Sequence, residues 1–188
     1  MRLSSTTLST WLARALSIAG HPLAVIPLTI AATTRNWLWT ALVAATTTLP
    51  LVLLISRNVR RGRWSDFDVS RRDQRLGLYR AGIPLLLLAA ALLLLAGASP
   101  RMLRALLAAA LLLASGALGH RFLKISMHMM FAAFCAVILV RFHPATAAAV
   151  VAFLLLVGWS RLHLGRHTRT EVAVGTLLGV AAGALAVF

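Results

Sequence analysis

Acidic residues are nearly absent from this chain. Its 188 residues include nineteen lysines and arginines but only four acids, Asp66, Asp68, Asp73 and Glu171, and the formal net charge is +15. Charged residues make up 12% of the chain, about half of their share in an ordinary soluble domain. Because 60% of the residues are hydrophobic, the composition excludes such a domain and predicts an integral membrane protein.

Cysteine is equally scarce. Cys135 is the only one and lies inside an apolar run, so no disulfide can form within the chain. High positive charge is also typical of nucleic-acid-binding proteins, but no soluble segment is left over here to bind nucleic acid. Basic loops that face the cytoplasm and anionic lipid headgroups are the better interpretation.

Apolar runs that approach the roughly 20 residues needed to cross a bilayer recur along the whole chain. We expect an all-α, polytopic membrane bundle of six to seven transmembrane helices, which forms a single domain over residues 1–188. The first run contains His21-Pro22, which predicts a local break, and it lacks a signal-peptide cleavage site, so we expect it to be retained. The expected spans are 15–34, 37–56, 81–98, 102–118, 127–140, 145–159 and 171–188.

The last expected span carries a face of small residues. Gly175, Gly179 and Gly183 are spaced by four, so they share one side of a helix. Such a face lets the backbone of a second helix approach closely. We therefore expect the last span to pack tightly against a neighbour.

Three polar segments, at 57–80, 119–128 and 160–171, are separated from one another by two expected spans each. This parity places them, with the N-terminus, on one side of the membrane. That side holds fifteen of the nineteen basic residues, and the other holds only Arg35, Arg101, Arg104 and Arg141. The positive-inside rule then predicts that the three segments face the cytoplasm, in a multi-pass protein of the inner (cell) membrane.

Basic residues, histidines and the only glutamate gather in these three segments. The last reads SRLHLGRHTRTE, the middle one contains KISMH, and the first is a basic loop with eight arginines and all three aspartates. Cations beside histidines suit a phosphate ester, because guanidinium groups hold its non-bridging oxygens and stabilise charge during transfer. We expect the aspartates to pair with arginines of their own loop, and the loop to cap the site or to lie among the headgroups.

Two of these segments resemble motifs of the type 2 phosphatidic acid phosphatase superfamily, which includes lipid phosphate phosphatases and vanadium haloperoxidases. SRLHLGRHTRTE at 160–171 is similar to the last motif of the family, which is Ser-Arg, five residues, His, three residues and Asp. Here Glu171 stands in place of the aspartate. KISMH at 124–128 keeps the serine and histidine of the family's Pro-Ser-Gly-His, with Met127 in place of the glycine. The first motif, Lys, six residues and Arg-Pro, has no match beyond the arginine-rich stretch 66–75.

The resemblance implies the core fold of that family and a phosphatase that needs no metal or cofactor. Its substrate would be a phospholipid phosphate or an isoprenoid mono- or diphosphate. His167 would attack phosphorus and form a phosphohistidine, Glu171 would orient the His167 ring, and His128 would protonate the leaving group and later activate water. The residues implied to hold the phosphate are Arg161, Lys124, Ser126, Ser160 and one or both of Arg72 and Arg75.

Two other interpretations stay open on the sequence. In the first, His163, His167 and Glu171, which are spaced by four, line one helical face and bind a metal. Membrane di-metal enzymes use many more histidines, and His21, His120 and His143 are poorly placed or on the opposite side. In the second, the chain is an inactive or non-enzymatic membrane protein whose basic loops bind anionic lipid.

Overall fold

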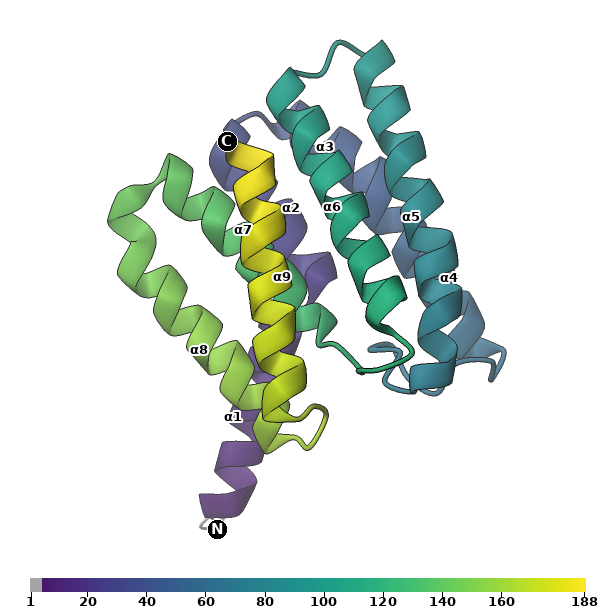
Figure 1. Cartoon of the computed structure of the whole chain (residues 1–188), viewed down its shortest axis with the longest axis vertical. Coiled ribbons are helices and arrows are strands. Elements are labelled where there is room, and N and C mark those ends of the chain that lie inside the picture. Colours follow the sequence, from purple (N-terminus) through teal and green to yellow (C-terminus); the bar gives the residue numbers. More distant parts are fainter. Residues whose placement is uncertain (1–4) are drawn as a thin grey trace.

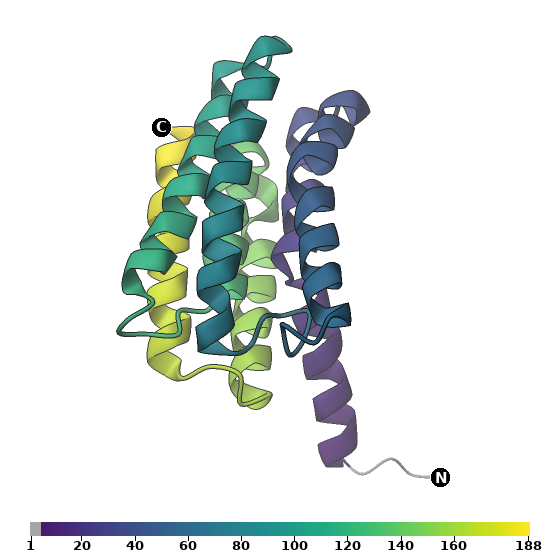
Figure 2. The ribbon, with the colours of Figure 1, turned by 90° about the vertical axis from the view of Figure 1, so that its right-hand side faces the viewer.

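The computed structural model describes residues 5–188, and these residues form helices joined by short loops, with no strand among them (Figures 1 and 2). The helices are α1 (Ser5–Ala19), α2 (Pro22–Thr34), α3 (Trp37–Val43), α4 (Leu49–Arg60), α5 (Arg72–Leu95), α6 (Pro100–Gly119), α7 (Met127–Phe142), α8 (Ala147–His163) and α9 (Arg169–Val187). A π-helical turn, Ala44–Thr48, joins α3 to α4, and a 3-10 turn, Pro144–Thr146, precedes α8. The expected all-helical fold is confirmed.

Among residues 5–188, five helical stretches are long and apolar enough to cross a membrane, or six when a bent pair is counted as one span, against the six to seven expected. The bent pair is Thr7–Ala19 with Pro22–Thr34, whose axes differ by 55°. His21 and Pro22 mark the break: His21 has an extended backbone and caps α2, and its side chain accepts a hydrogen bond from the Leu23 amide. The helix α7 is apolar but shorter than these spans. The structure thus agrees with a membrane protein and with the predicted break in its first span.

The polar segment at 57–80 is not one continuous loop. We expected the third span to begin at residue 81, whereas α5 begins at Arg72. No proline lies between Arg72 and Arg80, and Asp73 lies in the first turn of α5, where a negative charge complements the helix dipole. The consequence is that Arg72 and Arg75 are carried by a rigid helix, and only residues 61–71 form the loop.

The glycine face of α9 packs directly against α7, as predicted. A Cβ atom added at Gly175 would lie 2.8 Å from the Ser126 carbonyl oxygen, and one at Gly183 would lie 2.7 Å from Val137 Cβ. At Gly179 a Cβ would overlap the Met130 carbonyl oxygen. Only glycine allows this approach, so these three positions set the spacing between α7 and α9.

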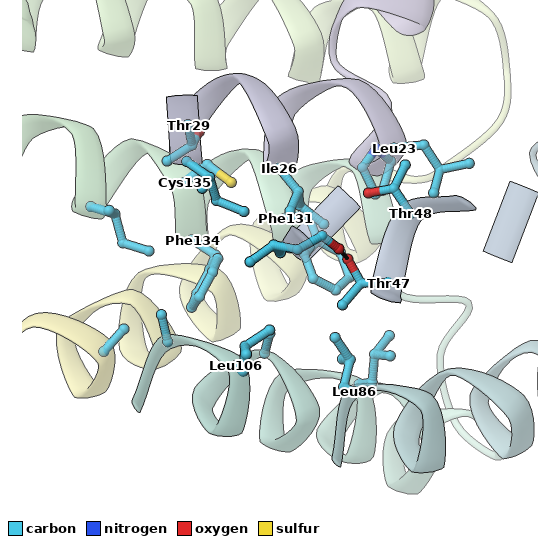
Figure 3. Close-up of a pocket in the computed structure, with 18 of the residues that line it drawn as sticks. Leu23, Ile26, Thr29, Thr47, Thr48, Leu86, Leu106, Phe131, Phe134 and Cys135 are labelled. Carbon is cyan, nitrogen blue, oxygen red and sulfur yellow. Dashed lines mark hydrogen bonds between the residues drawn. The ribbon is translucent and has the colours of Figure 1, made fainter. Parts of the chain in front are cut away.

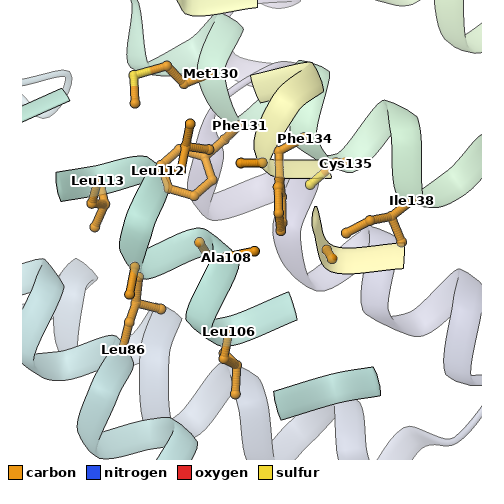
Figure 4. Packing of buried hydrophobic residues seen from close by; sticks show 14 of the residues in the cluster. Leu86, Leu106, Ala108, Leu112, Leu113, Met130, Phe131, Phe134, Cys135 and Ile138 are labelled. Carbon is orange, nitrogen blue, oxygen red and sulfur yellow. The ribbon is translucent and has the colours of Figure 1, made fainter. Parts of the chain in front are cut away.

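Buried apolar side chains from α5, α6, α7 and α9 form one large cluster, seen in Figure 4. Leu112 and Met130 have at most 2% of their surface exposed. Many leucines point outward instead, among them Leu88 and Leu95 on α5, which is the arrangement expected where helices face lipid. Inside a bilayer, close packing rather than exclusion of water holds such helices together.

The three polar segments lie at the same end of the bundle, the lower end in Figures 1 and 2. There the beginnings of α5, α7 and α9 meet the end of α8 and the break between α1 and α2. Hydrogen bonds tie the segments to one another: the Ser126 amide donates to the Glu171 carbonyl oxygen, and Arg75 donates to the Ile125 carbonyl oxygen. The predicted gathering of these segments is therefore confirmed.

Candidate functional site

His167 lies in the turn between α8 and α9, with only 1% of its side chain exposed. Its Nδ1 atom is 3.0 Å from the Lys124 carbonyl oxygen and 3.1 Å from Glu171 Oε2. Both partners are acceptors, so we assign the proton of the neutral ring to Nδ1. The other ring nitrogen, Nε2, then carries the lone pair, and Arg75 NH2 lies 3.5 Å from it.

Glu171 holds this arrangement through the start of α9. Thr168 is the N-cap, and a capping box joins it to Glu171: the Glu171 amide donates to Thr168 Oγ1, and the Thr168 amide donates to Glu171 Oε2. The second carboxylate oxygen accepts from the Lys124 amide at 3.2 Å. His167 and Glu171 therefore meet across a helix cap, and not along one helical face as the spacing of four suggested.

Arg75 projects from the second turn of α5 and is 97% buried, since 3% of its surface is exposed. Its guanidinium group donates to the Val69 and Ile125 carbonyl oxygens, at 3.3 and 2.6 Å, and its NH2 atom lies 3.5 Å from His167 Nε2. No carboxylate of the described residues forms an ion pair with it. A buried cation whose partners are neutral favours a site that receives an anion.

Arg161, in the last turn of α8, is the second buried arginine, with 2% exposed. Its NH1 atom donates to Asp68 Oδ2 at 3.0 Å and to the Ser17 hydroxyl of α1. We expected Asp68 to pair within its own loop, and this expectation is wrong for Asp68, although Asp73 does pair with Arg71. The loop 61–71 is thereby fastened to α8, and through Arg161 to α1, at this end of the bundle.

Two histidines face the other oxygen of Asp68. His128 Nε2 is 4.0 Å and His21 Nε2 is 3.7 Å from Asp68 Oδ1. The His128 atom is buried and has no hydrogen-bond partner among residues 5–188. His21 was expected to be poorly placed, but the break before α2 turns its ring against that of His128, with centroids 5.0 Å apart.

The remaining predicted site residues differ in how they are held. Lys124 Nζ donates to the Arg166 carbonyl oxygen at 2.7 Å. Ser126 is fully buried and caps α7 by accepting from the Met129 amide, and the Ser160 hydroxyl donates to the Val157 carbonyl oxygen. Arg72 is exposed and donates to the His120 carbonyl oxygen. The structure thus places Ser126 in the buried cluster, half-buried Lys124 at its edge and Arg72 at its surface.

Burial and neighbouring cations keep His167 uncharged. Burial, followed by the charges of Arg75, Arg161 and Lys124, lowers the pKa of His167 to about 3. The pKa of Lys124 is also lowered, first by burial and then by Arg75. Three cations therefore act on one neutral imidazole, and an anion bound among them would relieve their mutual repulsion.

A metal centre fits this donor set poorly. The only described group with metal-like geometry is His21, Asp68 and His128, whose ligand atoms lie within 4.8 Å of one another. Because His21 Nδ1 accepts from the Leu23 amide, the proton of its neutral ring is on Nε2, the atom that a metal would need. Asp68 already forms an ion pair with Arg161. The group is better described as two imidazoles on one carboxylate.

The alternative metal set, His163, His167 and Glu171, does not share one helical face in the structure. His163 ends α8 and stacks on Trp159, with ring centroids 4.9 Å apart, whereas His167 lies in the following turn.

No family model, curated protein or solved structure matches the chain. Asp68, His21 and Ser17 were not predicted as site residues, and only the His21-Pro22 break gave any signal in the sequence.

Proposed function

We propose that this protein is a membrane-embedded phosphatase that hydrolyses a lipid phosphate through a phosphohistidine intermediate. The observation that carries the proposal is the environment of His167. Its imidazole is neutral, its Nδ1 is held by Glu171, and its Nε2 faces Arg75. A nucleophile oriented by a carboxylate and surrounded by cations is what transfer of a phosphoryl group requires.

The phosphate would bind between Arg75 and Arg161, with Lys124 adding a third positive charge. In the first step, His167 Nε2 attacks phosphorus, a P–N bond forms and the P–O bond to the lipid breaks. His128 gives its proton to the departing alkoxide, so the products are the lipid alcohol and the phosphohistidine. In the second step, His128 takes a proton from water, the hydroxide attacks phosphorus and the P–N bond breaks. Inorganic phosphate leaves, and both histidines return to their first state.

Asp68 has a supporting role in this scheme. It neutralises one of the two buried arginines and keeps Arg161 extended from α8 toward the site. Its other oxygen lies 4.0 Å from His128 Nε2, close enough to help position this ring beside the departing oxygen. The resemblance to the phosphatidic acid phosphatase superfamily assigns the same roles to His167, His128 and Arg161, and the geometry of the site supports that assignment.

The test is release of inorganic phosphate from a long-chain lipid phosphate by purified protein in lipid nanodiscs. We expect His167→Ala to lower the rate by on the order of 10³-fold or more, because the nucleophile is removed. His163→Ala is the matched control, since this exposed ring stacks on Trp159 outside the buried cluster, and it should leave the rate unchanged. Equal turnover by the parent and His167→Ala proteins would show that the proposal is wrong.

An acid-labile, alkali-stable radiolabel on the protein after rapid quenching would identify the phosphohistidine. We expect this label with the parent and its loss in His167→Ala. Activity should persist in EDTA, because the chain's own cations supply the electrostatic stabilisation. Loss of all activity in EDTA, restored by a divalent cation, would favour a metal-dependent enzyme instead.

A further inference from the structure

A large apolar cavity opens beside the candidate site, within the bundle (Figure 3). Its volume is about 770 Å³, and its walls come from α2, the π-turn before α4, α5, α6 and α7. Side chains such as Ile26, Leu86, Leu106, Phe131 and Phe134 line its middle. This size lies within the range of roughly 300–1,000 Å³ that is usual for small-molecule sites.

The cavity reaches the site at one end. His21, Asp68 and His128 line it there, and these are the two imidazoles and the carboxylate described above. At the other end it is lined by Arg101, Arg104 and Arg141. Because His128 and Arg141 lie at the two ends of α7, thirteen residues apart, the cavity is about 20 Å long. It therefore runs through most of the height of the bundle.

We propose that this cavity holds the apolar tail of the substrate, a single long acyl or prenyl chain, while the phosphate lies at the Arg75 and Arg161 end. The inference rests on the proposed function and adds where the tail binds. Continuity carries it: the residue that would protonate the leaving oxygen, His128, is also part of the cavity wall. A chain attached to that oxygen can extend directly into the cavity.

The chemistry of the walls favours a hydrocarbon over water. The middle of the cavity is formed mainly by aliphatic and aromatic side chains, and water enters such a space poorly because it finds few polar partners. A tail gains little free energy by moving from the bilayer into the protein. Its role is instead to orient the ester bond at His167, so that chain length changes the rate of reaction more than the binding of lipid to the membrane.

Filling the middle of the cavity tests this assignment. Ala109 on α6 lines the cavity and is 6% exposed, so Ala109→Phe places a ring in the path of the tail. Ala91→Phe is the matched control, because Ala91 is exposed on the neighbouring helix α5. With a long-chain substrate, Ala109→Phe should lower kcat/KM at least about tenfold. With a short-chain ester of the same headgroup, both variants should match the parent.

Either of two results would overturn the inference. One is an equal loss on long-chain and short-chain esters in Ala109→Phe, which would indicate a general disturbance of the fold. The other is an unchanged rate on the long-chain ester in Ala109→Phe, which would place the tail in the surrounding bilayer.

A second measurement does not depend on turnover. A long-chain lipid phosphate with a diazirine at the end of its tail is irradiated with the His167→Ala protein in vesicles, and the labelled residues are mapped by mass spectrometry. We expect labels on the cavity wall, near Leu106 and Ile138, and their loss in Ala109→Phe. Labels only on outward-facing residues such as Leu88, or equal labelling by a neutral diazirine lipid without phosphate, would overturn the assignment.

The two proposals can fail separately. Labelled cavity walls in a protein that releases no phosphate would leave the tail site standing and remove the phosphatase. Phosphate release with no labelling inside the bundle would support the phosphatase and show that the tail does not bind in the cavity.

Discussion

The contact between α7 and α9 gives the sharpest test of the packing, through the substitution Gly179→Ala. The added methyl group would lie 2.8 Å from Ala133 Cβ and 3.0 Å from the Met130 carbonyl carbon, besides overlapping the Met130 oxygen. Carbon atoms in ordinary contact are about 3.5–4.0 Å apart. The two helices must therefore separate by about 1 Å over this contact.

The free-energy cost of this clash is partly offset by the higher helix propensity of alanine. Overpacking of this kind costs about 1–3 kcal/mol, and occasionally more, and a clash with backbone belongs at the upper end because no rotamer change can relieve it. Alanine is favoured over glycine inside a helix by about 1 kcal/mol. We therefore expect Gly179→Ala to lower the free energy of unfolding by about 2 kcal/mol or more.

Gly158→Ala on α8 is the control. A Cβ there would meet its nearest atoms, Met129 Cε and Val172 Cγ1, at 3.6 Å, which is ordinary contact. Only the helix propensity remains, so this variant should be as stable as the parent or up to about 1 kcal/mol more stable. Unfolding in detergent, followed by circular dichroism during titration with sodium dodecyl sulfate, measures both.

The separation of α7 from α9 should also displace residues of the candidate site. Both helices begin at the site, and a displacement of about 1 Å at a reacting group can lower a rate on the order of 10²-fold. We expect such a loss in Gly179→Ala and none in Gly158→Ala. If Gly179→Ala unfolds at the same detergent fraction as Gly158→Ala, the close approach of α7 and α9 described above is wrong.

Two further predictions concern single charges. Asp68→Asn should lower the free energy of unfolding by about 1–3 kcal/mol, because Arg161 loses a charged hydrogen bond, and it should slow phosphate release. Asp73→Asn is the control: Asp73 forms an exposed pair with Arg71, so this change should alter the free energy of unfolding by less than about 1 kcal/mol. Equal effects of the two changes in the unfolding assay would contradict the central place of Asp68. The pKa of His167 is about 3 in the folded protein and 6.5 in the reference state, so the unfolded chain binds its proton first as the pH falls. The parent should therefore lose stability between about pH 6.5 and 3, relative to His167→Ala, and parallel pH curves for the two proteins would refute this.

Local features of the fold could be predicted from the sequence because neighbours along the chain decide them. The His21-Pro22 break follows from the geometry of proline, and the spacing of Gly175, Gly179 and Gly183 is enough to define one face of a helix. The sequence placed the beginning of α5 nine residues too late, because the arginines before residue 81 were taken to lie outside the helix. Arginine is a good helix former, so a helix can continue beyond its apolar segment. Hydropathy therefore marks the boundary of the apolar segment and not the first residue of the helix.

The site was predictable only where its residues are close in sequence. His167 and Glu171 are four apart, and their contact was expected from that spacing, although a cap and not a helical face produces it. The Asp68–Arg161 pair joins residues 93 positions apart, and neither residue alone specifies its partner. The burial of Arg75 depends in the same way on the carbonyl groups of residues 69 and 125, which carry no signal of their own.

The carboxylate of Glu171 has a consequence for the order in which the buried cluster assembles. One side chain closes the first turn of α9, accepts the Lys124 amide and holds the His167 ring. Since α9 follows α1–α8 in the chain, Arg75, Arg161 and His128 are synthesised before Glu171. The contacts of Glu171 and of the His167 ring with Lys124 can form only when the start of α9 lies beside the start of α7. The final position of the His167 ring is therefore fixed by the same event that joins α9 to α7.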